Sequence, residues 1–180
     1  PINLENMNKL NRRYFIRNSM LGAGVLGMSP TIASMAKAPK DFGIGSNREV
    51  WIASLTLDAI SGVDYKQAIQ AAIKQMEYAL PFSPDIYCLP EVFHVAKITG
   101  PKPTVKEASE DGSGNIIAPF KQFAKKHACY IVCNVYTVHQ GKYYNAALII
   151  DRKGDVIGEY QKTRLTVNEM EKGLTRGPLS

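Results

Sequence analysis

Hydrophobic residues along this chain follow two patterns, continuous apolar runs and stripes at helical spacing. The runs Val50–Leu57, Asp85–Leu89 and Tyr130–Val138 are rich in β-branched and aromatic residues, which is typical of buried strands. Between these runs, apolar residues recur at helical spacing in two segments: Ala68, Ile69, Ala72, Ile73, Met76 and Leu80, and then Ile116, Ile117, Phe120, Phe123 and Ala124. The sequence therefore predicts two strand–helix units followed by a third strand.

Capping and helix-breaking residues set the limits of the two predicted helices. Asp64 is suited to cap the first helix, with Gln67 in the capping-box position, and Pro81 is expected to end that helix. Pro119 falls in the first turn of the second helix, where proline is tolerated. His127 lies near the end of this helix, and we expect it to interact favourably with the helix dipole.

A β-hairpin is predicted after the third strand. Asn145–Ile150 and Val156–Gln161 read as a fourth and a fifth strand, and Asp151–Asp155 has its glycine late, which suits a tight reversal. His139 is expected in the preceding hairpin turn. Two strand–helix units and a hairpin predict an α/β layer with a mixed sheet. Two helices cover one face of such a sheet, so its other apolar face needs a partner layer, and residues 41–180 alone are predicted to be poorly soluble.

Residues 93–113 form a long polar stretch that contains Gly100-Pro-Lys-Pro103 and is predicted to be a loop. Loops of this length inside a compact domain are often functional. His94 is expected to be a loop histidine without a role, with a place in a pocket wall as the alternative.

Composition and charge narrow the class of protein. The chain has 180 residues, 45% of them hydrophobic, which fits one soluble domain with a core. Its net charge of +6 suggests a nucleic-acid partner, but residues 1–40 hold six basic side chains against one acidic, whereas residues 41–180 hold 16 and 15. Nucleic-acid binding needs a basic face on the body of the protein, so we do not expect it here.

The basic N-terminal segment resembles an export signal. Paired arginines in Asn11–Arg17 precede a moderately apolar run, and small residues at Ser34–Ala36 suit signal cleavage. The paired arginines resemble the twin-arginine class, which implies transport of the folded protein to the bacterial periplasm by the twin-arginine machinery. A membrane anchor is the alternative, although glycines and Pro30 interrupt the apolar run.

These features divide the chain into four parts. The chain begins with Pro1, and Met7 is a better candidate start, so residues 1–6 are predicted to be an upstream extension. Residues 7–36 are the predicted signal peptide, and residues 37–47 are the predicted linker. Residues 48–180 remain as the folded domain.

Three cysteines, Cys88, Cys129 and Cys133, lie among apolar neighbours and are predicted to be buried, inert thiols. They lack the paired spacing of a metal clip, and the three histidines are scattered, so neither a metal site nor a cofactor is expected.

Two charged residues stand at the ends of predicted strands. Glu91 follows the second strand, and Lys162 ends the fifth. A carboxylate just after an apolar strand is expected to have a raised pKa, which suits a general base. A lysine ammonium held near it stabilises an oxyanion. By spacing alone, a structural ion pair is the better explanation of these two residues.

Several segments in order resemble the nitrilase, or carbon–nitrogen hydrolase, superfamily. Leu89-Pro-Glu-Val-Phe93 resembles its glutamate motif. Tyr143–Asp151 and Gly154–Lys162 resemble the hairpin that leads to its lysine, and Thr163–Glu169 with Gly173–Gly177 resembles the segment that follows. The resemblance covers residues 48–180 and implies that they are the N-terminal part of a four-layer α-β-β-α sandwich. It also implies that the full-length protein is a homodimer.

This resemblance also implies roles for individual residues. Glu91 is the general base, Lys162 stabilises the oxyanion, and Glu169 orients the site, with Glu171 as its competitor for that role. Asn145 is expected either to support the site through its amide or merely to begin a strand. The substrate is a small amide, nitrile or carbamoylated amine.

The nucleophile of the family is a cysteine that follows the lysine, and we expect it beyond Ser180. Cys88 is not a substitute, because three residues along a strand place it on the face opposite to Glu91. The segment alone is therefore expected to be inactive.

Two other functions are weighed. One is a metal-dependent endonuclease/exonuclease/phosphatase-like enzyme, in which a glutamate after the second strand binds magnesium. That interpretation expects an asparagine where the first strand ends at Asp58, and it leaves Lys162 unexplained. The other is a non-catalytic binding module on the same fold.

Overall fold

The computed structural model of the chain describes residues 49–112 and 114–178, and Val50–Ser180 forms one unit. The predicted extension, signal peptide and linker, residues 1–47, lie outside the described residues. Among the described residues, no helix is both long and apolar enough to cross a lipid bilayer.

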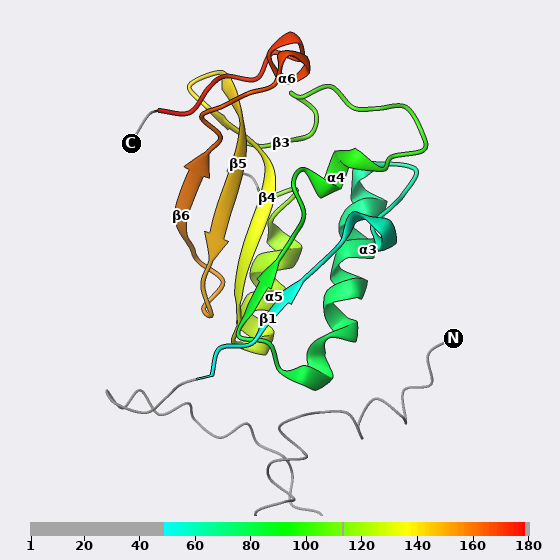
Figure 1. Cartoon of the computed structure of the whole chain (residues 1–180), viewed down its shortest axis with the longest axis vertical. Helices are drawn as coiled ribbons and strands as arrows, with labels where there is room; N and C mark the ends of the chain where they lie inside the picture. Colours follow the sequence, from blue (N-terminus) through cyan, green and yellow to red (C-terminus); the bar gives the residue numbers. More distant parts are fainter. Residues whose placement is uncertain (1–48, 113, 179–180) are drawn as a thin grey trace, which may run out of the picture. The chain divides into compact units, whose positions relative to one another are not determined.

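A six-stranded mixed sheet lies at the centre of the described chain (Figure 1). Its order is β1 (Ile52–Ser54), β2 (Ile86–Cys88), β4 (Tyr130–His139), β5 (Lys142–Ile150) and β6 (Val156–Gln161), with β3 (Ser109–Glu110) paired to the C-terminal half of β4. The pairs β1–β2, β2–β4 and β3–β4 are parallel, and β4–β5 and β5–β6 are antiparallel. The predicted mixed α/β sheet is confirmed.

Two helices, α3 (Tyr65–Tyr78) and α5 (Ala118–His127), begin where the sequence predicts. Asp64 caps α3, because its Oδ1 accepts the Gln67 N–H at 2.9 Å. The Gln67 side chain accepts the Val63 N–H instead of the Asp64 N–H, so the predicted capping box is not reciprocal. Pro81 lies just after α3, in the short 3-10 helix η2 (Leu80–Phe82).

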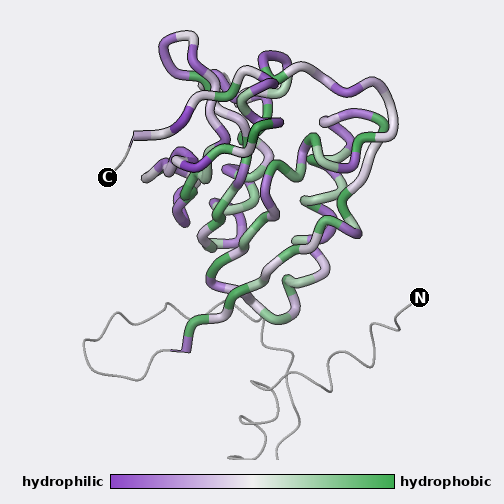
Figure 2. Tube along the Cα trace, turned by 45° about the horizontal axis from the view of Figure 1, so that its top comes forward, coloured by the Kyte–Doolittle hydropathy of each residue, from purple (hydrophilic) through white to green (hydrophobic). Residues whose placement is uncertain are grey.

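The apolar stripes of α3 and α5 cover one face of the sheet and form the core. Apolar and polar residues alternate along the trace (Figure 2), as a half-covered sheet requires. The fully buried side chains on this face of β2, β4 and β5 are Tyr87, Ile131, Cys133, Val135 and Ile150. They pack against Ala68, Ala72, Met76, Phe120 and Ala124 of the two helices.

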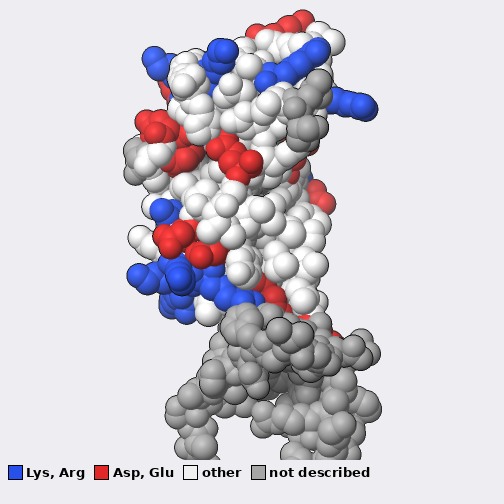
Figure 3. Space-filling view, turned by 90° about the vertical axis from the view of Figure 1, so that its left-hand side faces the viewer, with Lys and Arg blue, Asp and Glu red and all other residues white. Residues whose placement is uncertain are grey.

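The opposite face of the sheet, which we call the open face, is covered by described residues only at the end where Tyr136 and Asn145 are buried. Paired residues share a face, so the register places Ile52, Ile149 and Tyr160 on the open face. They are 63%, 41% and 60% exposed. Uncharged side chains also occupy a broad area of the side that carries β6 (Figure 3). The prediction that the helices leave one apolar face bare is confirmed.

Four short elements escaped the sequence analysis. The predicted loop 93–113 contains helix α4 (Phe93–Ala96) and strand β3. The 3-10 helix η1 (Leu57–Ala59) takes the end of the predicted first strand, and α6 (Val167–Glu171) follows β6. These elements are two to five residues long, so hydrophobic periodicity carries little signal for them.

The hairpin between β4 and β5 also differs from its prediction. β5 begins at Lys142 instead of Asn145, and His139 ends β4, paired with Lys142. The turn is Gln140–Gly141, with positive φ values of 51° and 75°. Two residues with positive φ are the usual geometry of a two-residue hairpin turn.

Glu110 organises the chain where it enters α5. Glu110 is only 5% exposed, and its two carboxylate oxygens accept hydrogen bonds from four backbone N–H groups. Gly112 and Gly114 each donate to Oε1 at 2.8 Å, and Ile116 and Ile117 donate to Oε2 at 3.1 and 3.2 Å. This carboxylate therefore satisfies amides that would otherwise be left unpaired before the helix.

Candidate active site

Four side chains from distant parts of the sequence meet at one end of the sheet. Glu91 follows β2, Asn145 lies in β5, Lys162 directly follows β6, and Glu169 lies in α6. The alternation along β5 places Asn145 on the open face, beside Tyr136 of β4. The sequence analysis predicted that Glu91, Lys162 and Glu169 share a site, and the structure brings all three together.

The Lys162 ammonium lies between the two carboxylates. Its Nζ is 2.7 Å from Glu91 Oε1, and 2.9 and 3.1 Å from the two oxygens of Glu169. Asn145 Nδ2 donates to the same Glu91 oxygen at 2.7 Å and to Glu169 Oε1 at 2.8 Å. Of its two predicted alternatives, Asn145 thus takes the supporting one.

Glu169 is fully occupied by hydrogen bonds. Besides Lys162 and Asn145, it accepts the N–H and hydroxyl of Thr166 at 2.8 and 3.0 Å, and its own N–H contacts the Thr166 hydroxyl, which makes a capping box for α6. Burial opposes ionisation, but these hydrogen bonds outweigh it and lower the pKa of Glu169 to about 2. Glu171, the predicted competitor, is exposed and makes no contact with this cluster within the described residues.

Glu91 makes fewer hydrogen bonds than Glu169 and is more exposed to solvent. Its side chain is 54% exposed, and Oε1 takes both hydrogen bonds, while Oε2 makes none within the described residues. The hydrogen bond from Lys162 lowers the pKa of Glu91, against a smaller raising effect of burial. The predicted rise of this pKa is therefore wrong, because an ion pair outweighs desolvation here. The same hydrogen bond raises the pKa of Lys162.

Backbone contacts hold Lys162 and Glu91 in place. The Lys162 N–H donates to the Asn145 carbonyl at 2.8 Å, and the Lys162 carbonyl accepts the Gly177 N–H at 2.9 Å. A Cβ on Gly177 would lie 2.3 Å from the Gln161 carbonyl oxygen, so only glycine fits there. Val92, next to Glu91, has φ 42° and ψ 37°, a left-handed conformation that is unfavourable for a β-branched residue.

Comparison with known proteins gives the family. Residues 55–177 match the sequence profile described as Carbon-nitrogen hydrolase. The chain belongs to the carbon–nitrogen hydrolase family. No curated protein sequence matches it significantly.

Solved structures agree with this assignment at the level of the fold. The carbon-nitrogen hydrolase from Helicobacter pylori G27 superposes with a TM-score of 0.55 at 16% identity, covering 72% of this chain and 45% of that chain. An N-terminal amidase with an Asn-Glu-Ala peptide gives 0.59 at 21% identity, covering 71% and 31%. The NitN amidase from Neterenkonia sp. AN1 gives 0.56 at 14% identity, covering 73% and 51%. The chain thus spans about a third to a half of these proteins.

Two of the three cysteines of this carbon–nitrogen hydrolase chain, Cys129 and Cys133, are buried in the core under the helices, as predicted. The predicted burial is wrong for Cys88, which is half-buried in β2 and lies on the open face, because it pairs with Val132. Burial raises the pKa of the Cys88 and Cys133 thiols. A raised pKa lowers the thiolate fraction, so these thiols are poor nucleophiles.

His94 is not the loop histidine that the sequence analysis expected. It lies fully buried in α4, where its Nε2 is 2.9 Å from the Ala108 carbonyl and its ring stands edge-on to Tyr136. Burial lowers its pKa to about 4, so the ring is neutral at pH 7. His127 ends α5 and packs on Phe123, which leaves its predicted dipole interaction a prediction.

A cavity of about 380 Å³ adjoins the cluster. Its wall includes Val92, Val95, Val105 and Tyr136, and Lys102 and Lys172 also line it. Tyr136 lines this cavity and also pairs with Asn145 of the cluster across β4 and β5. Burial, and then the Glu169 and Glu91 carboxylates, raise the pKa of Tyr136.

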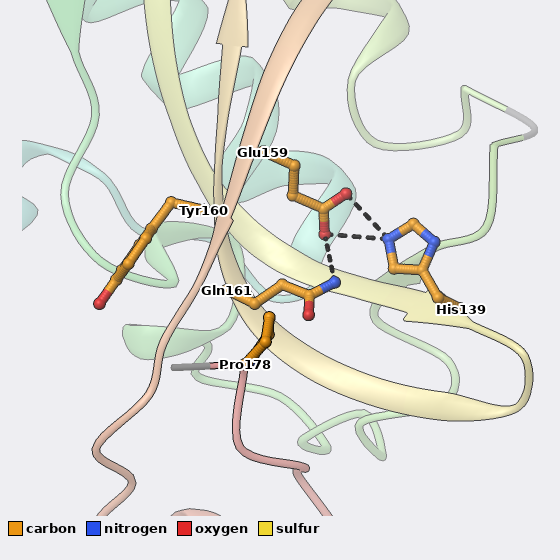
Figure 4. A pocket seen from close by; sticks show the side chains of 5 residues that line it. All are labelled: His139, Glu159, Tyr160, Gln161 and Pro178. Carbon is orange, nitrogen blue, oxygen red and sulfur yellow. Dashed lines mark hydrogen bonds and ion pairs between the residues drawn. The ribbon is translucent and has the colours of Figure 1, made fainter. Parts of the chain in front are cut away.

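A second hollow, of about 410 Å³, is lined by His139, Glu159, Tyr160, Gln161 and Pro178 (Figure 4). Figure 4 shows Glu159 and His139 pointing toward each other, 2.8 Å apart, and Tyr160 on the other side of the β6 ribbon. Glu159 pairs with the buried Leu148, so it lies on the helix-covered face, opposite Asn145. The sheet separates the Glu159–His139 pair from the Glu91–Lys162 cluster.

Proposed function

We propose that this chain supplies the glutamate and lysine of an enzyme that hydrolyses small amides, nitriles or carbamoylated amines, with a cysteine nucleophile carried downstream of Ser180. The family assignment supports the reaction class. The chain spans 31–51% of the solved proteins that it resembles, which leaves room for further active-site residues. The burial of Cys129 and Cys133 supports a nucleophile elsewhere.

The division of roles rests on hydrogen bonding. One oxygen of Glu91 makes no hydrogen bond with any described residue, and this exposed carboxylate is ionised at pH 7, which suits a proton acceptor. Glu169 has no such oxygen, and together with Asn145 it positions the Lys162 ammonium. Lys162 is the donor to the developing oxyanion.

The reaction then proceeds by covalent catalysis. Glu91 takes the thiol proton while the sulfur bonds to the carbonyl carbon of the amide, and Lys162 stabilises the tetrahedral oxyanion. The C–N bond breaks as Glu91 returns the proton to the leaving nitrogen, which leaves a thioester. Glu91 then takes a proton from water, and the hydroxide so formed attacks the thioester and frees the acid. Glu91 returns that proton to the departing thiolate, which restores the thiol.

The observation that carries this proposal is the position of the Lys162 ammonium between two carboxylates, of which Glu169 makes many more hydrogen bonds than Glu91. In the full-length protein, Lys162→Met is expected to lower kcat/KM for amide hydrolysis by about 10³-fold, because the oxyanion donor is lost. Ammonia release measures this effect. Lys153→Met, which removes an exposed lysine from the turn after β5, is the matched control and leaves the rate unchanged.

Two outcomes would contradict the proposal. Activity that survives in Lys162→Met would remove the lysine from the mechanism. A full-length protein that releases no product from any amide, nitrile or carbamoylated amine would favour the binding-module alternative. The 180-residue chain alone is expected to show no turnover.

We also propose that residues 7–36 direct twin-arginine export to the periplasm, supported by the paired Arg12 and Arg13 and the apolar run that follows. Fused to a reporter that folds before transport, residues 1–47 are expected to carry it to the periplasm, and replacing both arginines by lysine is expected to stop this.

The homodimer implied by the family resemblance is tested by sedimentation of the full-length protein.

A further inference from the structure

Three residues that line the cavity lie near residues of the cluster, in sequence or across a strand pair. Val92 directly follows Glu91. Tyr136 pairs with Asn145 across β4 and β5. Lys172 directly follows the last residue of α6, the helix that carries Glu169. A substrate whose C–N bond lies at Lys162 would therefore extend its remaining atoms into this cavity.

The lining of the cavity combines apolar walls with two ammonium groups. Val92, Val95, Val105 and Tyr136 provide the apolar part, and no carboxylate is among the described residues that line the cavity. Its volume of about 380 Å³ is typical of a small-molecule site. Such walls suit a short aliphatic chain.

Lys102 and Lys172 are exposed, and within residues 49–112 and 114–178 neither forms an ion pair. Lys102 also borders a neighbouring hollow that contains Asp64 and Glu107. The Glu107 carboxylate is instead bonded to Thr104, at 2.8 Å from both its N–H and its hydroxyl. The two lysines therefore give the cavity a positive charge that no described residue neutralises by contact.

We infer that this cavity selects substrates in which a short aliphatic chain links the scissile C–N bond to an anionic group, with Lys102 and Lys172 as the specificity-determining residues. The inference rests on the proposed function for its reaction, and it adds the class of substrate. Opposite charge at the far end of the chain attracts the substrate, whereas a cationic substrate is repelled.

The test uses three amides of equal length and different charge on the full-length protein: 4-carbamoylbutanoate, pentanamide and 5-aminopentanamide. We expect kcat/KM for the anionic amide to exceed that for the neutral one by about tenfold, and the cationic amide to be the poorest, as for two partly exposed charge pairs. N-carbamoyl-β-alanine and propylurea make the same comparison for an anion on the amine side. Added salt is expected to weaken the preference.

Variants assign the preference to the two lysines. The double variant Lys102→Met/Lys172→Met is expected to lose the tenfold preference, because its kcat/KM for 4-carbamoylbutanoate falls to that for pentanamide measured with the same variant. Lys106→Met removes an exposed lysine of the same loop that does not line the cavity, and it is expected to keep the preference. A preference that survives in the double variant would overturn the inference, as would wild-type protein that prefers the neutral compounds of both series.

Failure of the proposed function is distinguishable from failure of this inference. If no probe is hydrolysed, the reaction is wrong, and calorimetric binding of the same probes decides the inference. Tighter binding of the anionic probes in the wild type but not in the double variant supports it, and equal affinity overturns it.

Discussion

Glu110 and Glu91 both stand at the end of a short parallel strand, but they are held in opposite ways. Glu110 is buried, and its two oxygens accept four backbone N–H groups. Glu91 is 54% exposed, and a lysine and an asparagine share one of its oxygens. A carboxylate saturated by the backbone stabilises a loop, whereas one that keeps a lone oxygen beside an ammonium is available for proton transfer.

The loops around the two residues differ in the same sense. Gly112 and Gly114 take positive φ values of 90° and 82° beside Glu110, which glycine does without strain. Val92 takes a φ of 42° beside Glu91, where a β-branched residue is strained. The comparison teaches that strain is accepted at the candidate active site and avoided at the structural loop.

The largest expected effect is on the active-site side of this comparison. Glu91→Gln in the full-length protein removes the proposed proton acceptor and is expected to lower kcat by about 10³-fold. The fold is expected to stay intact, because the residue is exposed. Rate measurements with circular dichroism separate the two readouts, and a variant within tenfold of wild type would place the base elsewhere.

The pH profile sharpens this prediction. The pKa of Glu91 lies below its ordinary value of 4.5, so the acid limb of kcat/KM that reports this group is expected below pH 4.5. A limb near pH 6 would mean that another group titrates.

The second-largest expected effect is on the stability of the fold and concerns Glu110. Glu110→Gln replaces one acceptor oxygen by an NH₂ group, which leaves two buried N–H groups unpaired and destabilises the fold by about 2–4 kcal/mol. Urea unfolding measures the loss. Glu107→Gln, an exposed change in the preceding turn, serves as the control and is expected to cost less than about 1 kcal/mol. A Glu110→Gln protein as stable as this control would contradict the structural role.

Glu169 lies between the two cases, because it is saturated by hydrogen bonds and also contacts Lys162. Glu169→Gln keeps a side chain that suits a capping box but removes the charge, and we expect kcat to fall by about tenfold, as for the loss of one charged hydrogen bond.

Stability against pH isolates the charge of Glu169. Because its pKa falls from 4.5 to about 2 in the folded protein, its ionised form stabilises the fold above pH 4.5, and this contribution is lost as the pH falls toward 2. The loss is at most about 3 kcal/mol, and it should be absent in Glu169→Gln. Equal acid sensitivity of both proteins would refute the assignment.

The smallest effect concerns the strained backbone at Val92. Val92→Gly and Val92→Ala both remove the same packing, but only glycine relieves the positive φ. We therefore expect Val92→Gly to be more stable than Val92→Ala by about 1 kcal/mol, the reverse of the order in a helix. Chemical unfolding of the two variants checks this, and the ordinary order would show that the site is not strained.

Most of the fold could be predicted from local patterns. β6 has the predicted limits, Val156–Gln161. Its short strand-forming run begins after a hairpin turn and ends before Lys162, so both limits were visible in the sequence. The stripes of α3 and α5 form the core as predicted. α4 and β3 could not be predicted, because four and two residues are too few for a period to register.

The candidate site was predictable in identity but not in energetics. Family resemblance pointed to Glu91, Lys162 and Glu169. The role of Asn145 could not be predicted, because it depends on hydrogen bonds to Glu91 and Glu169, which lie 54 and 24 residues away in the sequence. The sign of the Glu91 pKa shift was missed for the same reason. Its cause is an ammonium 71 residues further along the chain, and the neighbouring residues indicate only burial.

The Thr166–Glu169 capping box has a consequence for how the catalytic machinery is assembled. One carboxylate both starts a five-residue helix and anchors the Lys162 ammonium. Fraying of that single turn would remove one of the two carboxylates that hold the Lys162 ammonium while the core stays folded, and under the proposed mechanism such molecules are inactive. Local order of a few residues, more than global stability, would then determine the fraction of molecules that is competent at any moment.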